Sequence, residues 1–342
     1  MKRSVSILLL VFFTLQVYAL GSKEAAITKE SLSAAETESR LPDYIIKAGA
    51  LKGPTGIGMI YLFENPPVLP QQTSVQSVAV PAADIMAAKL MSGELDIAVL
   101  PVNMAAKLYN AGLDLVMAAV VGNGMVQVIS ADPGLNKLEE LQGRTVYVAG
   151  QSATPDFLLR SLLQAQNIDP TSDLTLSYQL PIPEIAASLI AGRIETAILP
   201  EPFATMVLKG NPALRQAFPL APLWTALSGL DDYPMSVLVV RASLARERPQ
   251  AISAFMQAYK ESISKVLAEP AAAGILVEKY DMGLKAGIAE AAIPRSNYVY
   301  IEAPEARASI EALLKLFLAA APASVGGSLP AAGFYLDINA QQ

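Results

Sequence analysis

Hydrogen-bonding side chains stand at four places where a predicted strand leads into a predicted helix. Thr55, Asn103 and Glu201 each occupy one of these loops, and residues 150–155 (Gly-Gln-Ser-Ala-Thr-Pro) form the fourth. Hydroxyl, amide and carboxylate groups can donate to or accept from a small solute. The start of a helix also favours acceptor or anionic groups. The chemistry that these loops predict is recognition by hydrogen bonds.

The residues predicted to contact a ligand are Pro54, Thr55, Gly56, Asn103, Gln151, Ser152, Ala153, Thr154, Glu201 and Tyr233. Structural roles stay open as alternatives. The hydroxyl and amide residues are equally typical of helix N-caps. Glu201 would also suit the first turn of a helix, where a carboxylate interacts favourably with the dipole. Tyr233, predicted to stack on a flat ligand, would also suit packing beneath a hinge.

The chain of 342 residues contains no His and no Cys. This excludes a Ser-His-Asp triad, a thiolate nucleophile and metal sites made from His or Cys, and it removes the most common general base. We therefore expect a protein that is not an enzyme and that uses no cofactor and no metal. An enzyme that uses Glu201 with a Lys or a Tyr stays the alternative. The net charge of −6 and the lack of a basic stripe predict no nucleic-acid partner.

The N-terminus has the pattern of a secretory signal peptide. Lys2 and Arg3 precede an uncharged apolar run, and Val17-Tyr-Ala19 fits a small-x-small cleavage site loosely at its first position. The pattern predicts a signal peptide over residues 1–19, a flexible linker over residues 20–42, and a location in the periplasm or at the cell surface. An uncleaved anchor is the alternative. Leu20 stands where a lipoprotein would carry its modified Cys, so a lipid anchor is not expected.

One nine-residue pattern occurs twice. Residues 93–101 and residues 192–200 both read Gly-x-x-acid-x-Ala-x-Leu-Pro, and each copy follows an apolar helical pattern. We interpret the two copies as one strand-ending loop that is built once in each half of the chain. Two such loops facing each other would form a cleft, with Asn103 after the first copy and Glu201 after the second.

The hydrophobic patterns predict strands that alternate with helices, which is typical of an α/β fold with parallel strands. The predicted strands are 43–51, 74–80, 97–100, 118–130, 145–148, 174–180, 196–199 and 233–240. The predicted helices are 57–63, 81–91, 102–109, 138–143, 155–164, 182–191, 203–209, 249–267, 271–280 and 304–320. From residue 242 onward we expect a mainly helical chain that packs back on the first half.

These segments resemble the periplasmic solute-binding proteins of ABC importers, in the group that binds thiamine precursors, alkanesulfonates, taurine and nitrate. The resemblance covers about residues 44–320. It rests on Leu138-x-x-Leu-x-Gly-x-x-Val146, on residues 192–203 (Gly-x-Ile-Glu-x-Ala-Ile-Leu-Pro-Glu-Pro-Phe), and on the loop at residues 53–56. It implies an α/β, two-lobed fold of the type II periplasmic binding proteins. Each lobe would be a mostly parallel sheet flanked by helices, and two crossover strands would act as a hinge.

The resemblance also implies domain boundaries and a function. Lobe 1 would comprise residues 43–125 plus 238–342, and lobe 2 residues 126–237. The protein would be a monomer that captures a small solute between its lobes and delivers it to an ABC permease. The proposed loops carry hydroxyls, amides, one acid and no Arg, which favours a planar or heteroaromatic solute similar to a thiamine precursor. The alternatives are an anion of the sulfonate or nitrate type held by helix N-termini, a solute sensor without transport, and an enzyme on the same scaffold.

Overall fold

The computed structural model describes residues 42–151, 153–338 and 340. The predicted signal peptide and almost all of the predicted linker lie outside the described residues, so both stay predictions. Tyr44–Gln342 forms one compact unit by its internal contacts. In the described part of the chain, every helix is too short or too polar to cross a membrane.

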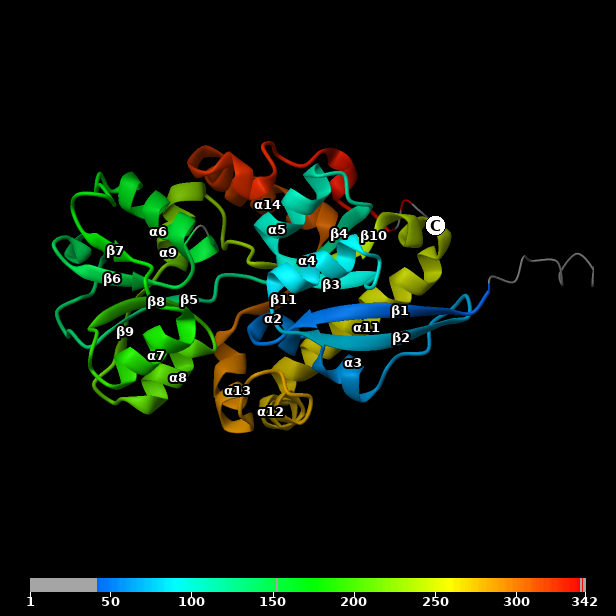
Figure 1. Ribbon diagram of the computed structural model, residues 1–342, viewed down its shortest axis with the longest axis horizontal. Helices are drawn as coiled ribbons and strands as arrows, with labels where there is room; N and C mark the ends of the chain where they lie inside the picture. Colours follow the sequence, from blue (N-terminus) through cyan, green and yellow to red (C-terminus); the bar gives the residue numbers. More distant parts are fainter. Residues whose placement is uncertain (1–41, 152, 339, 341–342) are drawn as a thin grey trace, which may run out of the picture. The chain divides into compact units, whose positions relative to one another are not determined.

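The first sheet has six strands in the order β11-β4-β10-β3-β1-β2 (Figure 1). Its strands are β1 (Tyr44–Leu51), β2 (Thr73–Val80), β3 (Ile97–Pro101), β4 (Leu115–Gly122), β10 (Ser236–Arg241) and β11 (Tyr298–Glu302). β1 pairs in parallel with β2 and β3, whereas β10 lies antiparallel between β3 and β4, and β11 is antiparallel to β4. β4 is buried along its whole length, which explains its continuous apolar sequence.

The second sheet has five strands in the order β7-β6-β8-β5-β9. Its strands are β5 (Val126–Ser130), β6 (Thr145–Val148), β7 (Thr175–Ser177), β8 (Thr196–Pro200) and β9 (Arg215–Pro219). β6 is parallel to β7 and β8, and β5 is antiparallel to β8 and β9.

Most strands of each sheet run in one direction, as expected, but both sheets also contain strands that run the opposite way. The reason lies in the two strands that follow a passage between the sheets, β5 and β10. Val126 at the start of β5 pairs with Pro200 at the end of β8, and Ser236 at the start of β10 pairs with Pro101 at the end of β3. A strand that enters its sheet at the edge where its neighbours end must run opposite to them.

Helices cover both faces of the sheets (Figure 1). They are α2 (Pro54–Ile57), α3 (Ile60–Glu64), α4 (Ala83–Met91), α5 (Val102–Asn110), α6 (Thr154–Ala165), α7 (Ile182–Ile190), α8 (Phe203–Gly210), α9 (Ala221–Ser228), α10 (Ala242–Glu247), α11 (Pro249–Ala268), α12 (Pro270–Lys279), α13 (Ala286–Ala292) and α14 (Ala303–Ala320). The short 3₁₀ segments are η1 (Leu138–Leu141), η2 (Ile293–Arg295), η3 (Pro322–Val325) and η4 (Ala332–Phe334).

The C-terminal part of the chain is helical except for β11, which the sequence patterns missed. This strand joins the edge of the first sheet, next to β4. α14 then packs against β4 and also against α6, where the rings of Phe317 and Phe157 lie 4.7 Å apart between centroids. Both side chains are buried, and burying an apolar side chain of this size stabilises a fold by about 1.5–3 kcal/mol. α14 therefore connects elements that flank both sheets.

Candidate ligand-binding site

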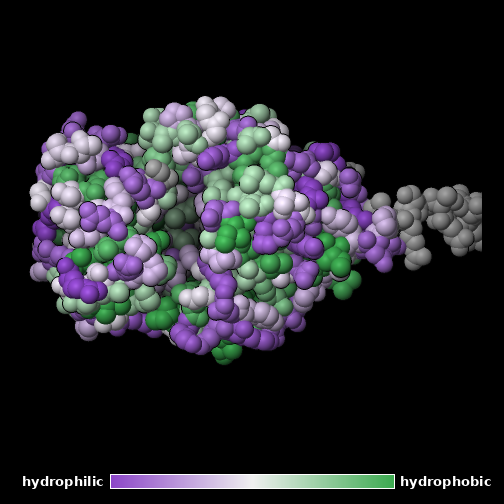
Figure 2. Space-filling model, in the orientation of Figure 1, coloured by the Kyte–Doolittle hydropathy of each residue, from purple (hydrophilic) through white to green (hydrophobic). Residues whose placement is uncertain are grey.

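A cavity of about 440 Å³ lies where strands end and helices begin. We call it the central cavity. Figure 2 shows the face of the molecule on which a recess opens between the regions that carry the two sheets. The central cavity is lined by Pro54, Thr55, Ala83, Pro101, Asn103, Met104, Met125, Ala149, Gly150, Ala153, Thr154, Pro155, Ile182, Pro200, Met235 and Ser236. None of these described lining residues is charged.

Five helices begin at the central cavity. α2, α4, α6 and α7 each have their first residue in its lining, and α5 follows the lining residue Pro101. Among the described residues, no N-cap side chain bonds to the backbone N–H groups at these five helix starts. The first N–H groups of a helix have no partner within the helix, and they carry the positive end of its dipole. The cavity is therefore a place where hydrogen-bond acceptors are favoured.

Five of the predicted contact residues line the central cavity: Pro54, Thr55, Asn103, Ala153 and Thr154. The structure brings them together from the helix starts of α2, α5 and α6. Their contact with a ligand stays a prediction. Sequence reasoning missed Met104, Met125, Met235 and Ser236, because isolated Met and Ser residues carry no local signal of a site.

The repeated pattern has the same local geometry in both copies. Gly93 and Gly192 have φ values of 75° and 67°, which favour glycine. The backbone N–H of each donates to a carbonyl of the last turn of the preceding helix, that of Leu90 or of Leu189, at 3.1 and 3.0 Å. Pro101 and Pro200, which end the two copies, both line the central cavity.

Gly56 has a role in packing. It is buried and does not belong to the lining of the central cavity. A methyl group at this position would overlap the carbonyl oxygen of Leu51 and the side chain of Met282. Its contact with a ligand stays a prediction. Ser152, also predicted to contact a ligand, lies outside the described residues.

Glu201 does not line the central cavity either. Its side chain is fully buried, and its Oε1 accepts a hydrogen bond from Nε of Arg295 at 2.9 Å. Its Oε2 accepts from the backbone N–H of Thr205 at 3.0 Å. Both carboxylate oxygens therefore have partners within the protein. Sequence reasoning missed Arg295, which lies far from Glu201 in the chain.

Tyr233 packs under the connection between the sheets, as its alternative role requires. It is 1% exposed, and its ring lies edge-on to Trp224 with centroids 6.0 Å apart. The neighbouring Asp232 accepts from the backbone N–H of Gly124 at 3.1 Å and from Asn297 Nδ2 at 2.5 Å. Burial raises the pKa of Asp232, although these hydrogen bonds act in the opposite direction. The cluster joins the two passages between the sheets.

A second cavity, of about 630 Å³, adjoins the first. We call it the side cavity. It shares Gly150 and Ile182 with the central cavity and is also lined by Gln151, Tyr178, Gln179, Leu180, Pro181, Pro183 and Phe203. Gln151, a predicted contact residue, therefore lies beside the side cavity rather than the central one.

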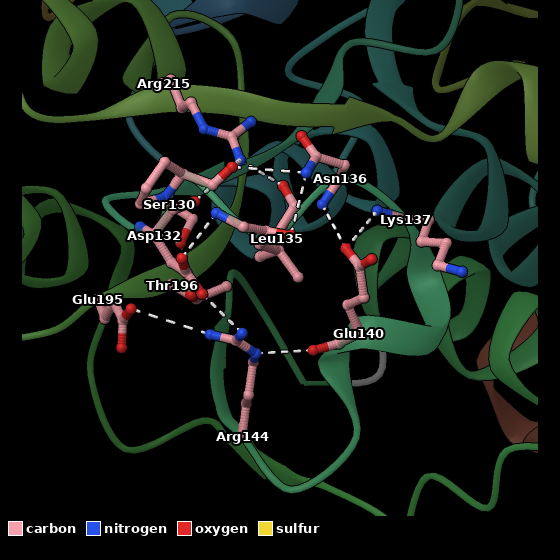
Figure 3. Close-up of polar contacts among 12 residues, drawn as sticks. Ser130, Asp132, Leu135, Asn136, Lys137, Glu140, Arg144, Glu195, Thr196 and Arg215 are labelled. Carbon is pink, nitrogen blue, oxygen red and sulfur yellow. Dashed lines mark hydrogen bonds and ion pairs between the residues drawn. The ribbon is translucent and has the colours of Figure 1, made fainter.

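The arginines at the far end of β5 have structural roles. Nη2 of Arg215 donates to the carbonyl oxygens of Asp132, Pro133 and Leu135 at 2.6–2.9 Å, and Arg144 pairs with Asp132 at 2.6 Å (Figure 3). These bonds hold the loop after Ser130, which is the end of β5 remote from Val126 and Pro200. The guanidinium groups thus serve the fold and do not line either cavity.

Comparisons with known proteins agree with this architecture. No curated protein sequence is a significant match, whereas the model of the NMT1-like family matches residues 69–278. A crystal structure of an ABC transporter from Parabacteroides distasonis is 30% identical, with a TM-score of 0.74 over 86% of this chain and 99% of that chain.

Two further structures share the fold at lower identity. The periplasmic aliphatic sulphonate binding protein SsuA from Escherichia coli is 18% identical, with a TM-score of 0.65 over 86% of this chain and 94% of that chain. The desulfurization enzyme DSZB is 13% identical, with a TM-score of 0.59 over 88% of this chain and 99% of that chain. The fold therefore occurs in binding proteins and in an enzyme. Since the family model covers more than half of the chain, the protein belongs to the NMT1-like family, and it has the two-lobed type II fold of the periplasmic solute-binding proteins of ABC importers.

Proposed function

We propose that the protein is the substrate-binding component of an ABC import system and that its solute carries an oxyanion head, such as a sulfonate or a carboxylate. The observation that carries this proposal is the meeting of five uncapped helix starts at the central cavity. In this proposal the protein acts as a monomer outside the cytoplasm and delivers the solute to a permease. The signal-peptide pattern of residues 1–19 supports the location.

The balance of charges supports an oxyanion head. Moving an anion out of water is costly unless hydrogen bonds replace its hydration. Backbone N–H groups at helix starts supply such bonds, and the dipoles of the four longer helices, α4, α5, α6 and α7, each add up to roughly half a positive charge. The hydroxyls of Thr55, Thr154 and Ser236 and the amide of Asn103 add donors. No carboxylate among the described lining residues would repel the head.

The lining of the central cavity gives less support to a planar heteroaromatic group at this position. Its described residues include no Phe, Tyr or Trp, so a flat ring would find no aromatic partner for stacking. Tyr233, predicted to stack on a flat ligand, is buried and packs against Trp224. The thioethers of Met104, Met125 and Met235 can instead contact an apolar part of the solute in several conformations.

A catalytic role has less support than a binding role. Glu201, the acid considered as a possible catalyst, accepts hydrogen bonds from Arg295 and Thr205 and does not line the central cavity. A general base must come within hydrogen-bond reach of the proton that it removes. The groups that do line the cavity bind and orient a solute.

Thermal denaturation and isothermal titration calorimetry would test the proposal. The panel comprises sulfonates and carboxylates of small size, together with neutral pyrimidines and other heteroaromatic compounds. A ligand present at about 100 times its Kd should stabilise the protein by roughly 2.7 kcal/mol. Asn103→Ala should weaken binding of the best sulfonate or carboxylate. Asn65→Ala, an exposed asparagine outside both cavities, is the matched control.

The outcomes separate the parts of the proposal. Stabilisation by neutral heteroaromatic compounds, with none by any sulfonate or carboxylate, would show that the oxyanion head is wrong while solute binding stands. A panel in which nothing binds would count against the binding function itself.

A further inference from the structure

We infer that the solute also carries a flat aromatic tail, which the side cavity holds while the oxyanion head occupies the central cavity. This inference rests on the proposed function, because it assumes a solute anchored in the central cavity. The predicted ligand class is therefore an aryl sulfonate or an aryl carboxylate.

The two cavities are adjacent, because Gly150 and Ile182 line both of them. The central cavity has about 440 Å³ and the side cavity about 630 Å³, and each volume lies within the usual range for a small-molecule site, about 300–1,000 Å³. A small head group would leave the larger of the two unfilled. A solute that extends past Gly150 would bury much more of its surface.

The walls of the side cavity are largely aromatic and apolar. Tyr178 and Phe203 are half-buried aromatic residues of the side cavity, and the central cavity has no aromatic residue among its described lining. Leu180 and Pro183 add apolar surface, whereas the exposed Gln151 offers an amide. Aromatic rings that stack or meet edge to face gain free energy beyond the burial of their area. The walls therefore suit a flat apolar group better than an aliphatic or charged one.

Hydrogen bonds hold the ring of Tyr178 in place. Its hydroxyl donates to Oδ1 of Asp156 at 2.5 Å and accepts from Nη2 of Arg160 at 2.7 Å. Asp156 is 3% exposed and also pairs with Nε of Arg160 at 2.6 Å. Burial and the hydrogen bond to Asp156 raise the pKa of Tyr178, so its hydroxyl keeps its proton. A wall that is fixed before the ligand arrives costs less entropy on binding.

The same network joins the two cavities. Asp156 lies in the first turn of α6, whose first residue, Thr154, lines the central cavity. Its partner Tyr178 lines the side cavity. The start of α6 and the aromatic wall are thus held in register with each other, as a solute with a head and a tail requires.

Calorimetric titrations with four probes would test the inference: methanesulfonate (head only), hexanesulfonate (flexible tail), 2-naphthalenesulfonate (flat tail) and 2-naphthalenemethanol (tail without the oxyanion). Each is titrated into the wild type and into Tyr178→Phe, Tyr178→Ala and Phe203→Ala. Phe63→Ala is the matched control, because Phe63 is also half-buried and packs on Tyr280 outside both cavities. Circular dichroism melts of every variant establish that it is folded.

We expect 2-naphthalenesulfonate to bind at least about tenfold more tightly than methanesulfonate, a difference of roughly 1.4 kcal/mol. Phe203→Ala should remove most of this difference and leave the affinity for methanesulfonate unchanged. Tyr178→Ala should also remove most of the difference when it is compared with Tyr178→Phe, which loses the same hydrogen bonds to Asp156 and Arg160. Tyr178→Phe, which retains the ring, should keep most of the preference, and Phe63→Ala should keep all of it.

Two results would overturn the inference. One is binding of 2-naphthalenesulfonate that is independent of both Tyr178 and Phe203, whatever the affinity for methanesulfonate. The other is equal or tighter binding of hexanesulfonate. If 2-naphthalenemethanol instead binds as tightly as 2-naphthalenesulfonate, with the same dependence on Tyr178 and Phe203, the side cavity is supported and the oxyanion head of the proposed function fails.

Discussion

Arg295 and Glu201 form an ion pair between parts of the chain that belong to different sheets. Glu201 directly follows β8 of the five-stranded sheet, and Arg295 ends η2, shortly before β11 of the six-stranded sheet. Nε of Arg295 lies 2.9 Å from Oε1 of Glu201, and its Nη2 lies 3.2 Å from Oε1 of Gln216. The carboxylate is fully buried, whereas the guanidinium is 39% exposed. The pair therefore connects the two lobes through one buried charge.

Arg295→Ala should destabilise the protein by about 3 kcal/mol, because it leaves the buried carboxylate of Glu201 without its cation. Urea denaturation measures the free energy of unfolding. Arg295→Ala combined with Glu201→Gln should be more stable than Arg295→Ala alone, since the uncompensated charge is gone. Arg246→Ala is the control, because its more exposed pair with Asp114 is expected to contribute at most about 1 kcal/mol. Equal stability of Arg295→Ala and Arg246→Ala would contradict the prediction.

Asp232 should make the stability depend on pH in a direction that follows from its raised pKa. An aspartate whose pKa is higher in the folded state binds its proton more tightly when folded. Its contribution to stability is complete below the ordinary value of 3.8 and is lost as the pH rises through the raised pKa. The free energy of unfolding of the wild type should therefore increase relative to that of Asp232→Asn as the pH falls from about 7 to about 4. Urea denaturation of both proteins across this range measures the difference, and a change of opposite sign would contradict the prediction.

Gly56→Ala and Thr55→Ala should separate packing from ligand contact. Gly56→Ala should lower the free energy of unfolding by about 1–3 kcal/mol, because the methyl group would overlap Leu51 and Met282. Thr55→Ala should change stability by no more than about 0.5 kcal/mol and weaken methanesulfonate binding roughly fivefold, the value of one hydrogen bond. If Gly56→Ala lost affinity for methanesulfonate while its free energy of unfolding stayed unchanged, Gly56 would contact the ligand.

Tyr233→Ala should destabilise the protein by about 3–5 kcal/mol, as expected for removal of a fully buried aromatic ring. Tyr233→Phe keeps the contact with Trp224 and loses only the hydrogen bond between the hydroxyl and the backbone of Val126, which should cost about 1 kcal/mol. Neither stability effect requires a ligand, and the affinity of Tyr233→Phe for methanesulfonate should equal that of the wild type. A changed affinity at unchanged stability would indicate that Tyr233 faces the ligand.

Local patterns predicted much of the fold. The repeated segments end in Pro101 and Pro200, and both prolines line the central cavity, as two facing loops would require. The helix starts at Thr55, Asn103 and Thr154 were also recognisable, because strands of alternating or continuous hydrophobicity end just before them. The lobe boundaries at residues 125/126 and 237/238 stay a prediction.

Relations between distant residues could not be predicted in this way. Nothing near Glu201 in the sequence indicates that Arg295 pairs with it, and nothing near Tyr178 points to Asp156. β9 and β11 were missed because they are short and only partly buried, so their hydrophobic pattern is weak. Gly56 shows a second limit of local patterns. A glycine near a helix start suggests a close approach of the backbone, but the sequence does not indicate that Leu51 is one of the groups that approach it.

The described lining of the central cavity consists of hydroxyl, amide, thioether and aliphatic groups together with backbone donors, and none of these gains or loses a proton near neutral pH. A sulfonate keeps its charge over the same range. Capture of such a solute would then proceed without any exchange of protons with the surroundings, and its affinity should stay level wherever the protein remains folded. Release would depend on moving the donors at the starts of α2, α4 and α5 away from those at the starts of α6 and α7.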